Sequence, residues 1–247
     1  MISLGVDIGG SGIKAALVDT EKGILVSERK RVETPDSLMP EDVIPAIVDL
    51  IKSFDNDCPV GMGFPAVVVN GTPRTPFTAH HIKEWVGFNV AEEVGNRLGR
   101  HVLMLNDADA AGIAEMRHGA GRGHSGTVVV LTLGTGIGSA MFLQGYLLPN
   151  TELGAIYLKG HDKYVEQYAA GRIKKEAGLK YPQYGERLDE FLRYLDHLFS
   201  PELFIIGGGI SKKHDKYAVS LTVDAEVVPA QMRNEAGIIG AAMAAAV

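Results

Sequence analysis

The feature that most constrains the fold is a strand–glycine turn–strand unit that occurs twice, about half a chain apart. In the first copy an apolar run over residues 2–8 reaches Gly9-Gly10-Ser11-Gly12. In the second, TVVVLTL over residues 127–133 reaches Gly134-Thr135-Gly136-Ile137-Gly138. An apolar, β-prone run resumes after each turn, which is typical of a hairpin. The repetition predicts an internal duplication that produces two related lobes.

The rest of the chain alternates between helical and strand patterns. A third glycine cluster, Gly207-Gly208-Gly209, follows the apolar run LFII. Asn89 is placed to begin a helix that stops at Gly99. The spacing of apolar residues predicts further helices at 40–54, 108–118, 164–177, 186–199 and 234–247, and strands at 60–69 (interrupted at Gly63-Phe64-Pro65) and 102–105. This alternation predicts the α/β class.

Composition excludes several classes of protein. With 46% hydrophobic and 22% charged residues, the 247-residue chain is globular rather than disordered. Its net charge of −6 argues against a nucleic-acid or anionic-membrane partner. The single cysteine, Cys58, excludes an intramolecular disulfide and a cysteine-clustered zinc site. We find neither a signal-peptide layout nor a membrane-spanning run, and therefore expect a cytoplasmic protein.

Three glycine turns after strands predict a polyphosphorylated ligand held largely by main-chain N–H groups. The alternative is that each turn is a plain hairpin or a close packing contact. The glycines lack the full G-x-G-x-x-G spacing, and none precedes Lys-Ser or Lys-Thr. Neither a Rossmann nor a P-loop site is therefore expected.

Two acidic positions adjoin predicted strand ends. Asp7 precedes the first glycine turn and could hold Mg²⁺ through waters, or else cap its own turn. Asn106 and Asp107 lie between a strand and a helix. Asp107 could accept a proton from a substrate hydroxyl as its oxygen attacks phosphorus, and Asn106 could hold a neighbouring hydroxyl. Capping of the helix is the structural alternative, and Asp109 is read as a structural acid.

Six segments together carry a resemblance to a known family. They are DIGGSGIKAALVD, NDADAAGIAEMRHGAGRG, LTLGTGIGSAMF, LLPNTELG, LFIIGGGISKK and VVPAQMRNEAGIIGAA. In this order they resemble the ROK sugar kinases, and most closely the polyphosphate glucokinase branch. The resemblance implies a duplicated actin-like (ribonuclease H-like) fold with a cleft between two lobes, Mg²⁺ dependence and a homodimer. We expect a smaller lobe at 1–107, a larger one at 108–233, and a C-terminal helix, about 234–247, that packs back on the first.

The resemblance also assigns roles to residues. It implies that Asp107 is the general base toward the 6-hydroxyl of the sugar, and Asp7, from its position before the first glycine turn, is the candidate to hold Mg²⁺ through water. The substrate site it implies consists of Asn106, Glu152, Glu166, His81, Gly63 and Pro65. The phosphate and nucleotide loops would be Gly9, Gly10, Ser11, Gly12, Lys14, Gly134, Thr135, Gly136, Gly208, Gly209, Lys212 and Lys213.

Departures from the family pattern leave the acceptor open. Gly160-His161-Asp162 replaces the cysteine-rich zinc motif of many relatives, so no zinc site is expected. Ala155 occupies the position after Glu-x-Gly where relatives usually have a histidine. His81 occupies a position where relatives commonly have an asparagine near the sugar. Glucose, mannose, an amino sugar or a cyclic polyol such as inositol are all candidates. The donor is expected to be polyphosphate, with ATP or GTP second; ATP as the main donor is the alternative.

Three other classes of protein are alternatives. A catalytically degenerate sugar-sensing protein would keep the sugar residues without transfer. A sugar-responsive transcription regulator would need a DNA-binding segment ahead of the kinase-like body, whereas the first strand here starts at residue 2. A filament-forming actin relative would have no use for the sugar-type acids Glu152 and Glu166.

Overall fold

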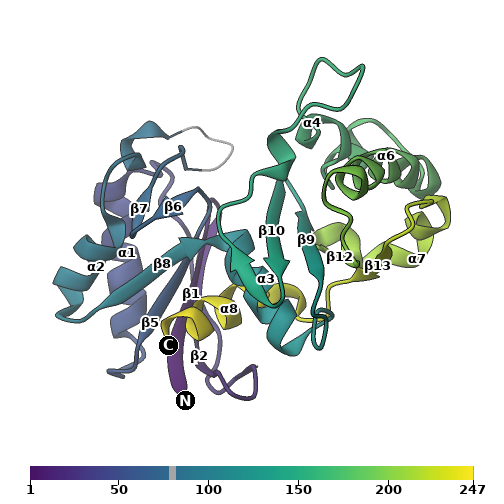
Figure 1. Cartoon of the computed structure of the whole chain (residues 1–247). Helices are drawn as coiled ribbons and strands as arrows, with labels where there is room; N and C mark the ends of the chain where they lie inside the picture. The colour runs from purple at the N-terminus through teal and green to yellow at the C-terminus, as the bar shows by residue number, and fades with distance from the viewer. Residues whose placement is uncertain (78–81, 247) are drawn as a thin grey trace. The chain divides into compact units, whose positions relative to one another are not determined.

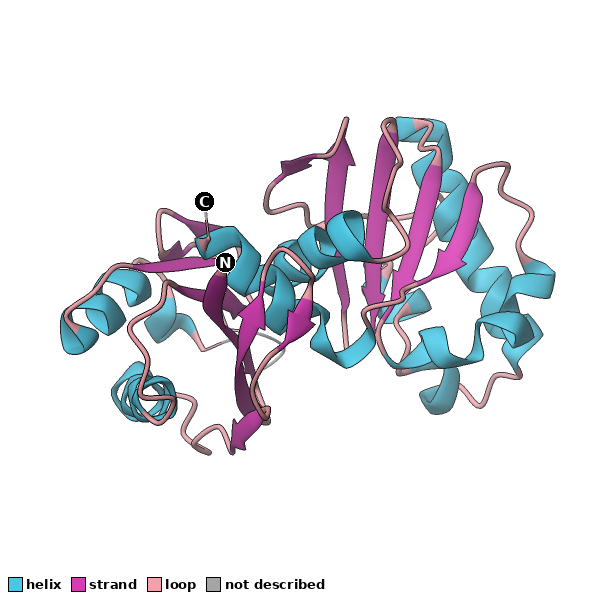
Figure 2. Ribbon diagram, turned by 90° about the horizontal axis from the view of Figure 1, so that it is seen from below, coloured by secondary structure: helices cyan, strands magenta, loops and turns pink. Residues whose placement is uncertain are grey.

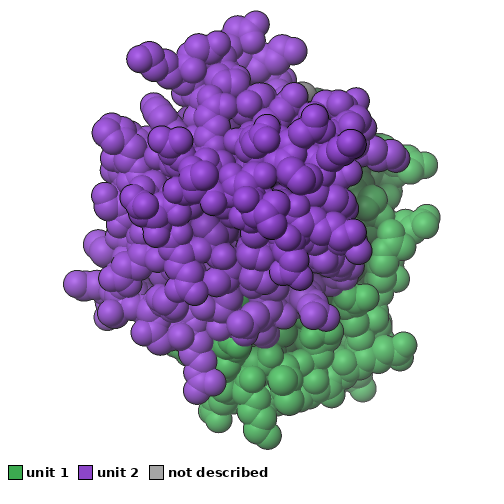
Figure 3. Space-filling view, turned by 90° about the vertical axis from the view of Figure 1, so that its right-hand side faces the viewer, with its two compact units in different colours: residues 1–118, 235–247 green, residues 119–234 purple. Residues whose placement is uncertain are grey.

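The computed structural model describes residues 1–77 and 82–246. The chain divides into two units, one made of residues 1–118 and 235–247 and the other of residues 119–234 (Figure 3). The first boundary therefore differs from the predicted division after residue 107. Helix α3 (Asp107–His118) stays with unit 1 because it packs along helix α8 (Ala236–Ala245). With both helices included, unit 1 is the longer of the two in residues, not the smaller as predicted.

The sheet of unit 1 has the strand order β3-β2-β1-β5-β8, with β4 paired to β2 (Figure 1). Strands β1 (Ile2–Gly9) and β2 (Gly12–Asp19) form an antiparallel hairpin. Strands β5 (Val60–Phe64) and β8 (Val102–Asn106) continue from β1 in parallel. The short strands β3 (Ile24–Leu25) and β4 (Lys30–Val32) complete the β2 edge.

The sheet of unit 2 repeats this order as β11-β10-β9-β12-β13 (Figures 1 and 2). Strands β9 (Thr127–Leu133) and β10 (Ile137–Leu143) form the antiparallel hairpin, and β11 (Tyr146–Leu148) extends it. Strands β12 (Leu203–Gly207) and β13 (Glu226–Pro229) follow in parallel. The duplication predicted from two hairpins is thus confirmed for two five-strand paths with matching directions.

In unit 1 the two faces of β1 are covered differently. Leu4, Val6 and Ile8 are buried in a core that helix α1 (Pro40–Lys52) helps to form, whereas Gly5 and Asp7 lie against α8. Side chains alternate between the faces of a strand, so this division follows from the sequence ISLGVDIG. Helix α2 (Val90–Leu98) has the predicted ends: Asn89 Oδ1 accepts from Glu92 N at 3.1 Å, and Gly99 adopts a φ of 68°.

Helix α8 lies unusually close to its neighbours because both sides of each contact are small. A Cβ atom at Gly61 would overlap the carbonyl of Ala241, and one at Gly240 would overlap the carbonyl of Ala110 in α3. The alanine- and glycine-rich tail sequence is therefore explained by packing: larger side chains would push the helix off the sheet.

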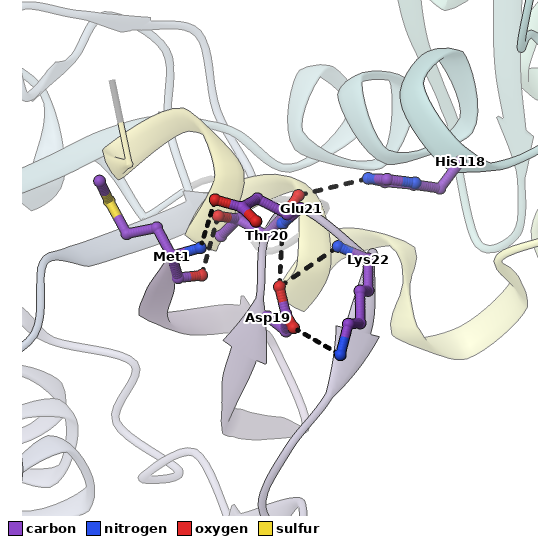
Figure 4. A network of polar contacts seen from close by, with 6 residues as sticks. All are labelled: Met1, Asp19, Thr20, Glu21, Lys22 and His118. Carbon is purple, nitrogen blue, oxygen red and sulfur yellow. Dashed lines mark hydrogen bonds and ion pairs between the residues drawn. The ribbon is translucent and has the colours of Figure 1, made fainter.

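The turn after β2 is held by polar contacts within unit 1 (Figure 4). Asp19 Oδ1 accepts from the main-chain N–H of Glu21 at 3.1 Å and of Lys22 at 3.3 Å. Thr20 bonds the carbonyl of Met1 at 3.0 Å, and its own carbonyl lies 3.3 Å from His118 Nε2 at the end of α3. Strand β2 is thereby tied to both the N-terminus and α3.

In unit 2 the long helix α6 (Tyr181–Phe199) covers the sheet. Leu188, Phe191, Leu192 and Leu195 are buried in one core with residues of β9 and β12. The helix begins five residues earlier than predicted, where Lys180 N donates to Gln183 Oε1 at 2.8 Å. Leu198, near the end of the helix, is 49% exposed. Helix α7 (His214–Tyr217) packs beside it.

Two predicted segments are wrong in detail. The single helix predicted at 164–177 is broken into α4 (Glu166–Ala169) and α5 (Ile173–Glu176). The break places Gly171 so close to the carbonyl of Leu133 that a Cβ would lie 2.7 Å from it. Strand β5 is not interrupted at Gly63-Phe64 but runs through both residues, and β6 (Val68–Val69) pairs separately with β7 (Thr72–Pro73). Among the described residues, no helix has the length and apolarity that a membrane span requires.

Candidate active site

In unit 1, Asp7, Gly63 and Asp107 align across three neighbouring parallel strands. Asp7 of β1 is in register with Gly63 of β5, and Gly63 with Leu105 of β8, two residues before Asp107. A Cβ at Gly63 would lie 3.5 Å from Asp107 Cα. Both acids thus occupy the carboxyl-end edge of the sheet, where ligands of α/β folds commonly bind. Pro65 follows β5 directly and is half-buried.

Asn106, not Asp107, supplies the cap of helix α3. Its Oδ1 accepts from Ala108 N at 2.8 Å and from Asp109 N at 3.0 Å, and its Nδ2 donates to Ala66 O at 3.0 Å. Asn106 is buried, while Asp107 is half-buried and accepts from Ala108 N at 2.8 Å. Capping of helix α3, which the sequence offered to either residue, is therefore done mainly by the Asn106 side chain. The cap fixes the end of β8 next to Asp107.

Asp7 lies opposite Lys14 at the start of the first glycine turn. Lys14 Nζ donates to Asp7 Oδ2 at 3.0 Å, as the register of the hairpin dictates. The other carboxylate oxygen lies beside Gly237 in the first turn of α8, since a Cβ there would be 3.2 Å from Oδ1. The positive end of a helix stabilises a carboxylate at such a position.

The first turn, Gly10-Ser11, is held by side chains from a neighbouring segment. Arg31 Nη2 donates to the carbonyl of Ser11 at 2.8 Å. Thr34 Oγ1 donates to the carbonyl of Gly9 at 2.6 Å. Arg31 lies on β4, whose pairing with β2 sets it opposite Lys14. Two cationic side chains therefore flank the turn that the resemblance assigns to phosphate.

The second turn, residues 134–136, is held by α4 and α5. Glu166 Oε2 accepts from Ile137 N at 3.0 Å, and a Cβ at Gly136 would lie only 2.6 Å from the same oxygen. Arg172 Nε donates to the carbonyl of Thr135 at 2.5 Å, and Arg172 N donates to the carbonyl of Gly134 at 3.0 Å. Glu166 is the first residue of α4, and Arg172 lies in the break directly before α5.

Ser139 holds the segment that contains Glu152 close to the second glycine turn, through bonds to the residues on either side of Glu152. Ser139 Oγ donates to the carbonyl of Thr151 at 2.6 Å and accepts from Leu153 N at 3.0 Å. Gly154 packs against the carbonyl of Ile137, where a Cβ would lie 2.6 Å away. The segments that carry Glu152 and Glu166 therefore meet at Ile137, directly after the second glycine turn. Glu152 and Ala155 are both exposed.

The third glycine turn adjoins the second. Gly208 has a φ of 77°, and a Cβ there would overlap the carbonyl of Leu133, the last residue of β9. Ser211 Oγ closes the turn by donating to the carbonyl of Gly208 at 2.8 Å. Lys212 and Lys213 follow on the short 3-10 helix η4 (Gly209–Lys213) and are exposed. Unit 2 thus brings two glycine turns and two glutamate-bearing segments together around the end of β9.

One predicted residue, His81, lies outside the described residues. Within the described ranges, 1–77 and 82–246, no group of three His, Cys, Asp or Glu side chains is arranged to hold a metal ion. In the stretch where many relatives carry the zinc motif, His161 Nε2 instead lies 2.9 Å from Glu190 Oε1 and its ring packs edge-on to Tyr168. Burial and the neighbouring Glu190 raise the pKa of Tyr168.

Sequence reasoning missed Arg31 and Arg172, which bond the carbonyls of the two turns. For Arg172 a signal was present, because it directly follows the V-E-Q-Y-A-A-G segment that carries Glu166. For Arg31 none was, since its position depends on the pairing of the three-residue strand β4.

Comparisons with known proteins identify the family of the chain. Residues 3–149 match the sequence profile of the ROK family. Polyphosphate glucokinase of Mycobacterium tuberculosis H37Rv is 43% identical over 241 residues, which cover 97% of this chain and 89% of that protein.

Two crystal structures are similar over nearly the whole chain. The inorganic polyphosphate/ATP-glucomannokinase of Arthrobacter sp. strain KM has a TM-score of 0.90 and 44% identity, covering 99% of this chain and 98% of that one. A ROK glucokinase of Streptomyces griseus, in complex with glucose and AMPPNP, has a TM-score of 0.83 and 28% identity, covering 100% and 99%. The duplicated sheet, the glycine turns and these similarities lead to one conclusion: this chain belongs to the ROK family.

Proposed function

We propose that this protein is a sugar kinase that transfers a terminal phosphoryl group from inorganic polyphosphate, or from ATP, to the 6-hydroxyl of glucose. The observation that carries the proposal is that Asn106 and Asp107 have different roles at the end of β8. Asn106 caps helix α3 and is buried, whereas the half-buried Asp107 carboxylate is held beside it at the sheet edge. The similarity to a polyphosphate glucokinase and to a polyphosphate/ATP-glucomannokinase supports the choice of reaction.

In the proposed reaction Asp107 accepts the proton of the 6-hydroxyl as that oxygen attacks the terminal phosphorus. The bond from phosphorus to the bridging oxygen breaks, and the shortened polyphosphate or ADP leaves. Main-chain N–H groups of the glycine turns stabilise the charge that develops on the phosphoryl oxygens. Glu152 and Glu166 in unit 2 bind sugar hydroxyls, and the second hydrogen on Asn106 Nδ2 is a further donor.

Asp7 fits a role in binding Mg²⁺. It is a half-buried carboxylate at a strand end, directly beside a glycine turn, and Mg²⁺ prefers such oxygen ligands. Mg²⁺ bound with the donor neutralises phosphate charge. Lys14, which bonds Asp7 Oδ2, holds the carboxylate in place and adds a second positive charge near the turn. On the strength of the family resemblance we further propose a cytoplasmic homodimer that also accepts GTP.

The proposed range of acceptors is broader than glucose. Ala155 lacks the polar side chain that usually follows the Glu-x-Gly motif, so one sugar hydroxyl loses a partner. The Arthrobacter relative is a glucomannokinase, which favours mannose as a second acceptor ahead of amino sugars or inositols. A panel of these four acceptors, each with polyphosphate, ATP and GTP, would rank them. If no pair showed transfer while a sugar raised the melting temperature, the protein would be a degenerate sugar-binding protein.

The decisive experiment on the mechanism is Asp107→Asn. We expect kcat to fall by about 10³-fold, because an amide cannot accept the proton, while glucose still raises the melting temperature. Asp57→Asn, at an exposed loop acid of the same unit, is the matched control and should be neutral. Near-normal turnover of Asp107→Asn would show that another group is the base.

A further inference from the structure

Two lysines from different helices lie over one tyrosine ring in unit 2. Lys174 Nζ of α5 is 4.3 Å from the centroid of the Tyr181 ring, and Lys216 Nζ of α7 is 5.5 Å from it. Tyr181 begins α6 and packs against the core of unit 2. A ring fixed in this way attracts cations through its negative face, so α5 and the sequence-distant α7 place two positive charges over one ring.

The two chain segments that supply these lysines are strongly basic. Residues 172–181 and 212–217 contain seven lysines and arginines and only two acids, in a chain whose net charge is −6. Both acids have basic neighbours: Glu176 Oε2 accepts from Arg172 Nη1 at 2.9 Å, and Asp215 lies 3.9 Å from His214 Nδ1. Like charges held close together repel one another, and an anion bound among them would remove that cost.

The basic stretch 172–181 contacts the second glycine turn through its first residue, Arg172. Arg172 donates both its main-chain N–H and its Nε to carbonyls of that turn. Two residues further on is Lys174. Lys212 and Lys213 follow the third glycine turn, which packs against the end of β9 next to the second. Positive charge therefore extends from the turns that are proposed to hold the donor toward Tyr181.

We propose that Arg172, Lys174 and Lys216 form a subsite for the distal phosphates of an inorganic polyphosphate chain. The inference rests on the proposed function, which places the reacting end of the donor at the glycine turns. Polyphosphate continues as a flexible polyanion beyond its reacting end, whereas the phosphates of ATP end at a nucleoside. Cations outside the reaction centre therefore add affinity for long polyphosphate, and not for ATP.

The test is the double variant Lys174→Gln/Lys216→Gln, assayed with long-chain polyphosphate, tripolyphosphate and ATP. We expect the KM for long-chain polyphosphate to rise about tenfold, from the loss of two charge contacts, one half-buried and one exposed. The KM values for tripolyphosphate and ATP and all kcat values should stay within about twofold of the wild type. Arg193→Gln, which removes an exposed charge from α6 of the same unit, is the matched control and should change none of them.

The outcomes separate this inference from the proposed function. An equal rise in KM for all three donors, or no rise for long-chain polyphosphate, would overturn the subsite. If the wild type transfers no phosphoryl group at all, direct binding of long-chain polyphosphate decides: the subsite stands if the double variant binds it more weakly, and fails if binding is equal. Lys216→Gln alone, at an exposed position, repeats the test should the double variant have a lowered melting temperature.

Discussion

The two glycine turns occupy the same place in their hairpins but differ in length, two residues against three, and in what holds them. Each follows the inner strand of a hairpin, β1 or β9, and each has an arginine on a turn carbonyl, Arg31 on Ser11 and Arg172 on Thr135. The first turn is otherwise held by a hydroxyl, from Thr34. The second also carries a carboxylate, because Glu166 accepts from Ile137 N.

The same kind of hairpin therefore has a different task in each unit. An arginine that bonds a turn carbonyl occupies its acceptor end, which leaves main-chain N–H groups to face an anion. Glu166 does the opposite, since it uses a main-chain N–H that a phosphate could have bound. In the proposed function the same glutamate binds the sugar, so the second turn couples the acceptor to the donor, whereas the first serves the donor and Mg²⁺.

The largest effect that would test this comparison is expected from Gly136→Ala. The new methyl group would lie 2.6 Å from Glu166 Oε2, and the end of a flexible side chain moves away readily. We expect a protein of nearly normal melting temperature whose glucose KM rises by about 30-fold, as expected for losing a charged hydrogen bond. Gly134→Ala is the control, because a Cβ there meets nothing within 4 Å. Equal glucose KM values in the two variants would uncouple Glu166 from the sugar.

A smaller effect is expected from removing the arginines in turn. Arg31→Gln and Arg172→Gln each leave a turn carbonyl without its charged donor, and we expect the KM for ATP to rise about fivefold in both. Only Arg172→Gln should also raise the KM for long-chain polyphosphate beyond this, because Arg172 belongs to the proposed subsite. Steady-state kinetics with both donors measures the difference. Identical donor profiles for the two variants would mean that the turns are equivalent.

The smallest effect concerns the turns that follow the two hairpins. Main-chain donors and Lys22 lower the pKa of Asp19 from 3.8, although burial, the largest single influence, acts to raise it. A carboxyl whose pKa is lowered by folding stabilises the folded state above its ordinary pKa, and this contribution is lost as the pH falls through the lowered value. The equivalent turn of unit 2, Gln144-Gly145, has no acid.

We therefore expect Asp19→Asn to be slightly less stable than the wild type at pH 7, with the difference lost as the pH falls through the lowered pKa of Asp19. Urea unfolding at a series of pH values from 7 downward measures it. Gln144→Glu is the counterpart control, which should not become more stable as pH rises. A stability difference for Asp19→Asn that is independent of pH would assign the effect to shape rather than charge.

Patterns local in sequence predicted much of this fold. The hairpins could be predicted because long apolar strands end in glycine. Helix α2 could be predicted because Asn89 and Gly99, which cap it, adjoin it in sequence. Strand β13 was not predicted, since EVVP is short and only partly buried. The helix at 164–177 was predicted whole because its periodicity is good; the need of Gly171 to approach the Leu133 carbonyl is set by a residue nearly forty positions earlier.

The site shows the same limit. The acids at strand ends and the glycine turns were predicted as a set, because each is a local signal. That Asn106 rather than Asp107 caps α3 could not be predicted, since either side chain suits the position. The arginines on the turn carbonyls depend on contacts across the fold, and no pattern in sequence specifies them.

Because α8 belongs to unit 1, it determines which unit can complete its folding first during translation. A ribosome releases residues 1–118 first, yet one face of their sheet is covered by residues 236–245, which emerge after all of unit 2. The contiguous middle segment can close as soon as it is free, while the earlier-made sheet must wait with Gly5 and Gly61 uncovered. The half of the protein that is translated first is therefore expected to mature last.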